Sequence, residues 1–589
     1  MRARLAWCAA LAFVGIGLFA CYLLQARTYA VTSDGAANAL QAWGMLHGHL
    51  LLHGWWLSDV SFYTTELPEY VLVEAIAGLR PEVVDISAAL TYTFLVLLVA
   101  MVGRGHARGR EGVLRALLAG GIMAAPGLGY GTYAVLSAPD HTGTGVPIMV
   151  ILLLLDRLDP PDRPRACWYL PPLLMVLLVW VQVADTLATL AAAIPIALVG
   201  AIRAGRYLLR RGSGPAKRVW QDLLLSAAAV ASIPLAAVTL GVLRASGGFY
   251  LHPLPGPLLA SPAAWPGQAR MLGQCVLTLF GADVIGQPLG VNYGLMLLHM
   301  AGVAVVALAL LAGIGRFFSR MDRISQILVL SVIGVLGAAE FSTQMTNIFS
   351  VREIATVLPV AAALAGRVVG GASLGRASLG RARLGRARLG RVLTAALGVG
   401  LAGYLAALGY AAAQPAAPAE NQALADWLRA HGLVEGLAGY WQADSVTLDS
   451  GGKVVIAPIF GASPYRWESE SSWYDPAVSH PDFVVTVSSP PDEEMFARPV
   501  VIHRVFGRPA QVYRYGRYTI MVWKKNLLTD LGTPPPLPPA ATIAARATST
   551  GIDGAIDAAP DGQSGHAPGW MAPFISLRVR PLTPDRRSP

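Results

Sequence analysis

Hydrophobic runs recur along the first 413 residues, many of them near 20 residues long, and polar segments separate them. A helix of about 20 apolar residues crosses a bilayer core. A helix also satisfies its own backbone hydrogen bonds in lipid. The pattern therefore predicts an all-α polytopic membrane domain of about 11 transmembrane helices over residues 1–413. The predicted spans are Leu5–Leu24, Ile86–Val102, Ala116–Val135, Val146–Leu155, two helices within Trp168–Ala201, Leu223–Leu243, Gly294–Ile314, Ile324–Ala339, Ile354–Ala365 and Val392–Ala413.

The arginines predict how these spans are oriented. Arginine-dense loops alternate along the chain with polar segments rich in acids, amides and aromatics. Because Lys and Arg favour cytoplasmic loops, we expect the N-terminus and the arginine loops inside, and a multi-pass protein of the plasma membrane. The first outer loop would cover residues 26–85. The Arg-rich five-residue repeat at 373–391 would be a cytoplasmic connector that touches anionic headgroups.

The composition changes after residue 413. Residues 414–531 contain one amphipathic pattern, NQALADWLRAHG, and four short apolar runs, KVVIAPIF, DFVVTVS, VVIHRVF and YTIMVW. These predict one helix and four strands of a small extracytoplasmic α+β domain. Residues 532–589 are rich in Pro and Ala, which predicts a disordered tail.

Composition narrows the class of protein further. The 589 residues are 54% hydrophobic and 14% charged, with a mean hydropathy of +0.51, whereas soluble domains carry about 25% charge. The net charge of +10 would suggest nucleic acid in a soluble protein. Here the arginines lie in loops between apolar runs, so we expect no nucleic acid partner. The four cysteines show no zinc, redox or disulfide spacing.

Candidate chemistry gathers in the polar stretch that follows the first apolar run. Asp34 stands in Ser-Asp-Gly at the start of this stretch. A carboxylate at the bilayer edge can act as a general base. It can equally cap the helix predicted to follow, by accepting orphan N–H bonds.

The same loop carries further polar side chains that either bind a hydroxyl-rich ligand or form the solvated face of an interfacial helix. These residues are Asp59, Tyr63, Glu66 and Glu69. Three histidines in the loop have no diagnostic metal spacing. We therefore assign no metal ligands and leave a divalent cation open.

Two later outer segments add candidates. Asp140 and His141 form a ligand contact or a second acid/base pair, or else an Asx-capped turn. Asp185 interrupts an apolar hairpin, either at a cavity or at its turn. Arg352 is a cation on the outer face, and it either grips a phosphate or pairs with Glu353.

These features resemble the GT-C superfamily of membrane glycosyltransferases, which includes protein O-mannosyltransferases, aminoarabinose transferases and bacterial family 39-like proteins. The similar features are the early acidic residue in Ser33-Asp34-Gly35, the following QAWGMLHGHLLLHGW, and the later GLAGYWQADSVTLDSGGKVVIAPI. The chain has a single Asp where oligosaccharyltransferases carry Asp-x-Asp, and it shows no Gly-rich nucleotide loop.

The resemblance implies a transferase that moves a sugar from a polyprenyl-phosphate donor to an extracytoplasmic acceptor, which would be a glycan, a lipid or a protein. Asp34 would deprotonate the acceptor hydroxyl, and Arg352 would stabilise the phosphate left on the lipid. The alternatives are a transporter or lipid flippase, or a non-catalytic scaffold of the cell envelope.

Overall fold

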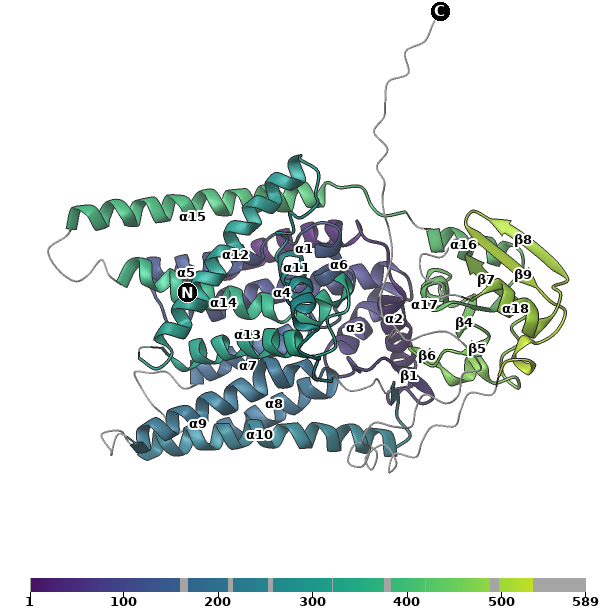
Figure 1. The fold of residues 1–589 in the computed structure, drawn as a ribbon, viewed down its shortest axis with the longest axis horizontal. Coiled ribbons are helices and arrows are strands. Elements are labelled where there is room, and N and C mark those ends of the chain that lie inside the picture. Colours follow the sequence, from purple (N-terminus) through teal and green to yellow (C-terminus); the bar gives the residue numbers. More distant parts are fainter. Residues whose placement is uncertain are drawn as a thin grey trace, which may run out of the picture.

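The computed structural model describes residues 2–158, 168–209, 216–252, 258–319, 321–375, 383–418, 420–487 and 497–532. Within these ranges the molecule has a long helical part and a smaller part built on a sheet (Figure 1). The helices of the helical part are α1 Arg2–Ala26, α2 Ser33–Leu46, α3 Glu66–Ala77, α4 Glu82–Arg104, α5 Gly109–Met123, α6 Tyr130–Leu136, α7 Gly145–Leu158, α8 Leu170–Ala184, α9 Ile194–Leu209, α10 Ala216–Ala245, α11 Trp265–Leu279, α12 Val291–Arg316, α13 Arg323–Phe341, α14 Val357–Gly375 and α15 Arg383–Ala412.

Six helices in the described ranges are long and apolar enough to cross a membrane. A seventh span forms if the 3₁₀ helix Ile348–Ile354 and the start of α14 are counted together, across a bend of 56°. The expected count of about 11 spans is not confirmed and stays a prediction.

The predicted span Ala116–Val135 is wrong as a single helix. The chain leaves the helical conformation between α5 and α6, where the sequence reads Pro126-Gly127-Leu128-Gly129. Proline lacks the N–H that a continuing helix needs, and glycine weakens a helix. The predicted hairpin within Trp168–Ala201 is confirmed, because α8 ends at Ala184 and a π-helical segment, Thr189–Ala193, leads into α9.

One central helix, α4, packs against α1, α5, α7 and α14, while α8, α9 and α10 pack together at one side. A continuous core of buried aliphatic side chains joins these helices. Because α4 is 23 residues long, it extends roughly 34 Å. It therefore links the two ends of the helical part.

The C-terminal part contains a six-stranded sheet in the order β5-β4-β3-β7-β9-β8, with α16 Glu420–Ala430, α17 Tyr440–Asp449 and α18 Pro499–Phe506 around it. Strands β4, β3 and β7 are parallel, and β5, β9 and β8 are antiparallel to their neighbours. The strand bounds are β3 Glu435–Ala438, β4 Val455–Phe460, β5 Ser463–Pro464, β7 Phe483–Val487, β8 Gln511–Tyr515 and β9 Tyr518–Val522.

The prediction of a small α+β part is confirmed, with one strand wrong. The run VVIHRVF forms helix α18, with Pro499 at its first turn and Ile502 and Phe506 buried four residues apart. A short apolar run fits a strand or a buried helix face equally well. The α+β part also contains β3, β8 and α17, which the sequence analysis did not predict.

The predicted first outer loop is joined to the C-terminal part by a second, three-stranded sheet. Strand β1, Trp55–Leu57, pairs with β2, Tyr250–Leu251, and with β6, Ser469–Glu470. Beneath this sheet lies a core shared by the loop and the C-terminal part, in which Trp55 packs edge-on against Trp473. The loop is therefore held against the C-terminal part and is not free in solvent.

Helix α2 carries Asp34 in its first turn, so the helix fixes where this side chain lies. Its N-cap is Thr32, whose side chain accepts a hydrogen bond from the Gly35 N–H, so the alternative of Asp34 as the cap is wrong. A Cβ on Gly35 would lie 2.7 Å from Val84 Cγ1. Glycine at this position therefore lets α2 approach the start of α4 closely.

Candidate active site

An ion pair between Asp34 and Arg352 is the centre of the site, although the two are 318 positions apart in sequence. One terminal guanidinium nitrogen of Arg352 donates to Asp34 Oδ2 at 2.9 Å. The Asp34 side chain is 16% exposed, whereas that of Arg352 is only 7% exposed. Asp34 is thus the member of the pair that solvent reaches.

Arg352 also joins Asp140 to the site. The nitrogen that binds Asp34 lies 3.4 Å from Asp140 Oδ2, and the other donates to Ser137 Oγ at 2.6 Å. The guanidinium lies 4.1 Å from the centre of the Tyr133 ring, a cation–π contact. Arg352 therefore pairs with Asp34 and Asp140, and not with Glu353 as one alternative had it.

Asp140 is a buried carboxyl group that accepts a hydrogen bond from a second residue, because Asn38 Nδ2 donates to Asp140 Oδ1 at 2.7 Å. Burial raises the pKa of Asp140 to about 6, although the nearby Arg352 opposes the rise. Two carboxyl groups thus share one guanidinium.

The C-terminal part contributes Tyr440 and Glu468 to the same cluster. Tyr440 Oη lies 2.6 Å from Asp34 Oδ1 and 2.6 Å from Glu468 Oε2. A phenol has one proton to donate, so two short hydrogen bonds require a proton on one of the carboxyls. Glu468 is buried, and burial raises its pKa well above the usual value. We infer that Glu468 donates to Tyr440, which donates to Asp34.

Asp444, on α17, is a further buried acid near this chain of hydrogen bonds. Its side chain is fully buried, and neither of its oxygens has a hydrogen-bond partner among the described residues. Burial, and then the charge of Asp34, raise the pKa of Asp444 well above its usual value. Burial at this position therefore favours the neutral form of Asp444 over the carboxylate.

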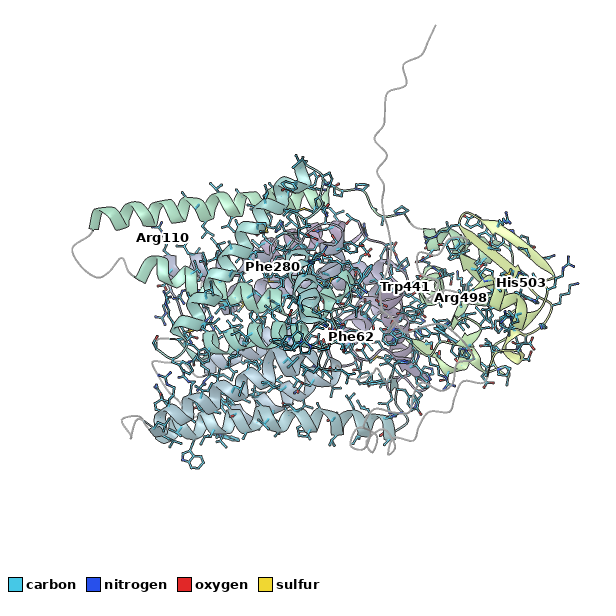
Figure 2. The ribbon with its side chains drawn as sticks, viewed as in Figure 1. Phe62, Arg110, Phe280, Trp441, Arg498 and His503 are labelled. Atoms are coloured by element: carbon cyan, nitrogen blue, oxygen red, sulfur yellow. The ribbon has the colours of Figure 1, made fainter. Side chains whose placement is uncertain are left out.

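A second cluster surrounds His141 and Asp185. His141 Nδ1 lies 2.9 Å from Asp185 Oδ2, and Thr144 donates to the same oxygen at 2.7 Å. Burial alone would lower the pKa of His141, but the adjacent Asp185 carboxylate raises it to about 10. This imidazole is therefore a cation. It packs edge-on against Phe62, which lies where the helices meet the C-terminal part (Figure 2).

The remaining predicted residues divide between this second cluster and its surroundings. Glu66 begins α3, is buried, and has its pKa raised well above the usual value by burial. Thr144 links it to Asp185, with a contact of 3.5 Å to Glu66 Oε1. Glu353 and the exposed Asp59 both interact electrostatically with His141.

Two predicted residues contact neither ion pair directly. Glu69 accepts a hydrogen bond from Thr91 Oγ1 at 2.5 Å, and burial raises its pKa to about 7. Tyr63 donates to the carbonyl of Leu50 at 2.7 Å, with its ring beside Phe249. Tyr63 therefore stabilises the predicted first outer loop by a contact within that loop.

No group of three or more His, Cys, Asp or Glu side chains arranged to hold a metal occurs in the described part of the chain. The sequence analysis singled out Asp34, Asp140, His141 and Arg352 but did not assign Tyr440, Asp444 or Glu468. Tyr440 and Asp444 lie in GYWQADS, inside a segment noted only for its resemblance. Nothing local to the sequence shows that they meet Asp34.

Comparison with solved structures finds matches at low sequence identity. ArnT from Cupriavidus metallidurans, solved with undecaprenyl phosphate, matches at 13% identity and a TM-score of 0.48, over 90% of this chain and 99% of that one. The Archaeoglobus fulgidus oligosaccharyltransferase, solved with a tethered acceptor peptide, matches at 14% identity and a TM-score of 0.44, over 81% of this chain and 69% of that one. No family model and no curated protein matches the chain.

Proposed function

We propose that the protein is an integral membrane glycosyltransferase of the GT-C type, which transfers a sugar from a polyprenyl-phosphate donor to an acceptor outside the cytoplasm. The observation that carries the proposal is the Asp34–Arg352 ion pair. It sets a carboxylate that solvent reaches beside a buried guanidinium, and sugar transfer from a lipid phosphate needs both a base and a phosphate-binding cation.

In this proposal Asp34 removes the proton from the acceptor hydroxyl as it attacks the anomeric carbon. Its oxygens are fixed by donors from Tyr440 and Arg352, so one oxygen lone pair can be aimed at the acceptor. The bond between the anomeric carbon and the phosphate oxygen then breaks, and the electron pair leaves with the lipid phosphate. The sugar inverts its configuration in this single displacement.

Arg352 would receive the phosphate. Among the described residues, the hydrogen bonds of its guanidinium go to three acceptors: Asp34, Asp140 and Ser137. A phosphate oxygen would therefore replace one of them. The 3.4 Å contact to Asp140 is the longest and is the weakest by hydrogen-bond geometry. His141 supplies a second buried cation nearby, as Asp140 also interacts with it electrostatically. Two cations would stabilise the charge that develops on the leaving phosphate.

The experiment compares wild type with Asp34→Asn in nanodiscs, supplied with radiolabelled polyprenyl-phosphate sugars and an envelope extract. Asp426→Asn is the matched control, since Asp426 is an exposed acid of α16 in a long ion pair with Arg429. We expect wild type and the control to release polyprenyl phosphate, and Asp34→Asn to lose at least 100-fold in rate, the usual contribution of a general base.

Three outcomes would count against this assignment. Equal release by Asp34→Asn would remove Asp34 from the mechanism and leave Asp140 or Glu66 as the base. Tight binding of the lipid with no turnover of any donor would favour the transporter or flippase alternative. Full function in an envelope assay after Asp34 and Arg352 are both replaced would favour a scaffold.

A further inference from the structure

A cavity of about 210 Å³ lies where the last turns of α9 meet the turn between α12 and α13. Arg203 lines this cavity and also lines a neighbouring one together with His106, which follows the end of α4. The Asp34 cluster lies at the other end of the helical part, since Gly35 packs on Val84 near the start of α4. The positive-inside rule predicts that the cavity end is cytoplasmic.

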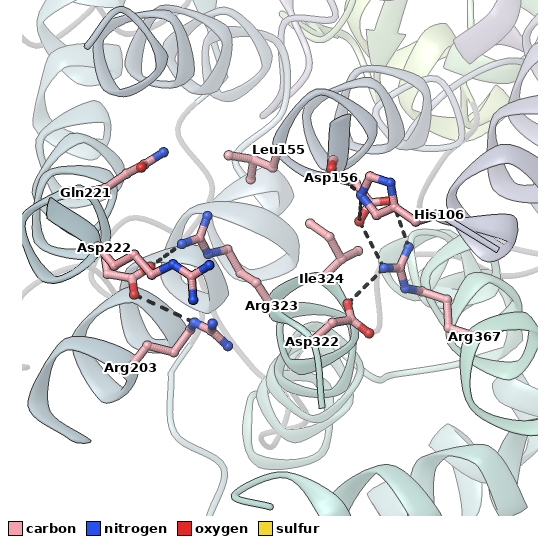
Figure 3. Close-up of a pocket in the computed structure, with 11 residues that line it drawn as sticks. His106, Leu155, Asp156, Arg203, Gln221, Asp222, Asp322, Arg323, Ile324 and Arg367 are labelled. Atoms are coloured by element: carbon pink, nitrogen blue, oxygen red, sulfur yellow. Dashed lines mark hydrogen bonds and ion pairs between the residues drawn. The ribbon is translucent and has the colours of Figure 1, made fainter. Parts of the chain in front are cut away.

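Arg203, at one side of the cavity, is already paired within the protein. Its Nε lies 3.7 Å from Asp222 Oδ2 (Figure 3), and its Nη1 donates to Gln326 Oε1 at 3.0 Å. Gln326 donates in turn to the carbonyl of Phe317 at 2.7 Å. These contacts fasten α9 to α10 and α13, so Arg203 requires no ligand.

Arg206, three residues further along α9, is different, because its guanidinium has no carboxylate partner and makes no hydrogen bond within the described part of the chain. Its contact there is with Phe318, whose ring centre lies 5.6 Å from the guanidinium carbon. The described lining residues of the cavity include no Asp or Glu. A guanidinium has five N–H donors, so Arg206 presents both a charge and open donors to the cavity.

Tyr207, the next residue of α9, adds a hydroxyl group to the same cavity. This hydroxyl makes no hydrogen bond to any residue that the structure describes. The stretches that flank the lining residues, 210–215 and 320, lie outside the described residues, and their sequence contains three arginines and no acid. Among the described residues, the cavity therefore offers one unpaired cation and one unpaired hydroxyl group.

Apolar side chains beside the cavity are exposed. Leu311 and Ile314 are exposed on the last turns of α12, and Phe318, which is 64% exposed, follows them and lines the cavity. Leu208 and Leu209 are exposed at the end of α9. Neighbouring exposed apolar side chains are unusual on a surface that faces water, but they are ordinary beside lipid. These surroundings favour an amphiphilic ligand over water or a free anion.

We propose that this cavity binds the headgroup of an anionic phospholipid, with Arg206 and Tyr207 donating to the phosphodiester oxygens and an acyl chain along Phe318. A guanidinium fork matches the geometry of phosphate oxygens. A phosphodiester carries one negative charge, which matches the single unpaired cation, whereas a phosphate monoester carries close to two near neutral pH. Anionic lipids are enriched in the cytoplasmic leaflet, where the positive-inside rule puts the cavity. The proposal does not depend on the function assigned to Asp34.

The test measures binding of dioleoyl phosphatidylglycerol and dioleoyl phosphatidylcholine, as separate probes, to the full chain in detergent by native mass spectrometry. Arg206→Gln removes the unpaired charge, and Tyr207→Phe removes the hydroxyl group alone. Arg108→Gln is the matched control, because Arg108 is an exposed arginine at the start of α5, at the same end of the helical part, and lines neither cavity. We expect Arg206→Gln to weaken phosphatidylglycerol binding about tenfold, the loss typical of a charged hydrogen bond. Tyr207→Phe should weaken it several-fold, and the control should bind as wild type.

Three results would overturn the proposal. Equal losses in Arg206→Gln and Arg108→Gln would mean that diffuse surface charge holds the lipid, and equal affinity of wild type for the two lipids would mean that the anion is not recognised. Glycerophosphoglycerol, the same headgroup without acyl chains, should bind far more weakly than the lipid, so equal binding of the two would exclude a lipid as the occupant. A wild-type melting temperature shows that a variant folds. If Arg206→Gln melts early, Tyr207→Phe, which removes one oxygen, decides the test.

Discussion

Replacing Asp140 with asparagine should make the protein more stable at neutral pH, although it removes a member of the central ion cluster. Burial raises the pKa of Asp140 from its ordinary 3.8 to about 6, so holding the charged form in the folded state costs about 3 kcal/mol. The Asn38 donor, 2.7 Å from Asp140 Oδ1, would still find an amide oxygen in Asp140→Asn. The contact that is lost, to Arg352, is the long one of 3.4 Å.

The pH dependence follows from the direction of this pKa. A carboxyl whose pKa is higher in the folded state contributes its full stability below pH 4, and that stability is lost as the pH rises through 6. Wild type should therefore lose up to about 3 kcal/mol across this window through Asp140, and Asp140→Asn should not. The difference between the two proteins should be near zero at pH 4 and reach about 3 kcal/mol at pH 7.5.

The assay is thermal unfolding in nanodiscs between pH 4 and 8, followed by tryptophan fluorescence. The unfolding entropy of a chain of this size is about 1 kcal/mol/K, so we expect Asp140→Asn to melt about 3 °C above wild type at pH 7.5 and at the same temperature at pH 4. Asp34→Asn is the comparison variant. It removes the charged acceptor that lies closer to Arg352 than Asp140 does, so we expect no stabilisation. A parallel loss of stability in both variants at pH 7.5 would refute the reasoning, because it would mean that Asp140 gains more from Arg352 than it loses to burial.

Three further changes test other parts of the site. Tyr440→Phe should lower sugar transfer by about 10- to 100-fold with little change in melting temperature, because it breaks the hydrogen-bond chain that orients the base; unchanged transfer would exclude such a role. Gly35→Ala should destabilise the protein by about 1–3 kcal/mol, since its Cβ would lie 2.7 Å from Val84 Cγ1, and adding Val84→Ala should restore the melting temperature. His141→Gln should lower the folding stability by about 3–5 kcal/mol near neutral pH, because it leaves Asp185 charged and without its cation. Pairing with His141 lowers the Asp185 pKa, so this loss of stability should become smaller in acid. A loss that does not change with pH would argue against the ion pair.

Hydropathy alone could predict most of the helical part, because the length of an apolar run can be read directly from the local sequence. The errors occur where that signal is ambiguous. The break at Pro126 interrupts a run that is apolar on both sides. The helix α18 has the length of a strand, so its type is decided by the sheet beside it and not by its own residues.

For the candidate site, single residues could be predicted from the sequence, but the contacts between them could not. Asp34 and Arg352 could each be singled out, because an acid and an arginine at the predicted outer face are uncommon enough to require a reason. Their contact could not be predicted, since the two are 318 positions apart in sequence and no periodicity carries information over that distance. Glu468 was still harder to find, as nothing around it in sequence resembles a catalytic motif.

The way the cluster is assembled links folding to the proposed chemistry. Its charges come from the predicted first outer loop, the loop before α7, the 3₁₀ helix before α14, and the C-terminal part. Each of these groups is costly to bury alone, because a buried charge without a partner is strongly unfavourable. Ser33 Oγ donates to the carbonyl of Tyr440 at 2.6 Å, and β1 pairs with β6 only one residue beyond Glu468. The same contacts that dock the C-terminal part therefore bring Tyr440 and Glu468 to Asp34, so the base is oriented only when the two parts of the chain are together. A separate C-terminal part would leave Asp34 with Arg352 alone, and the loss of the Tyr440 donor would free one carboxylate oxygen to rotate away from the acceptor.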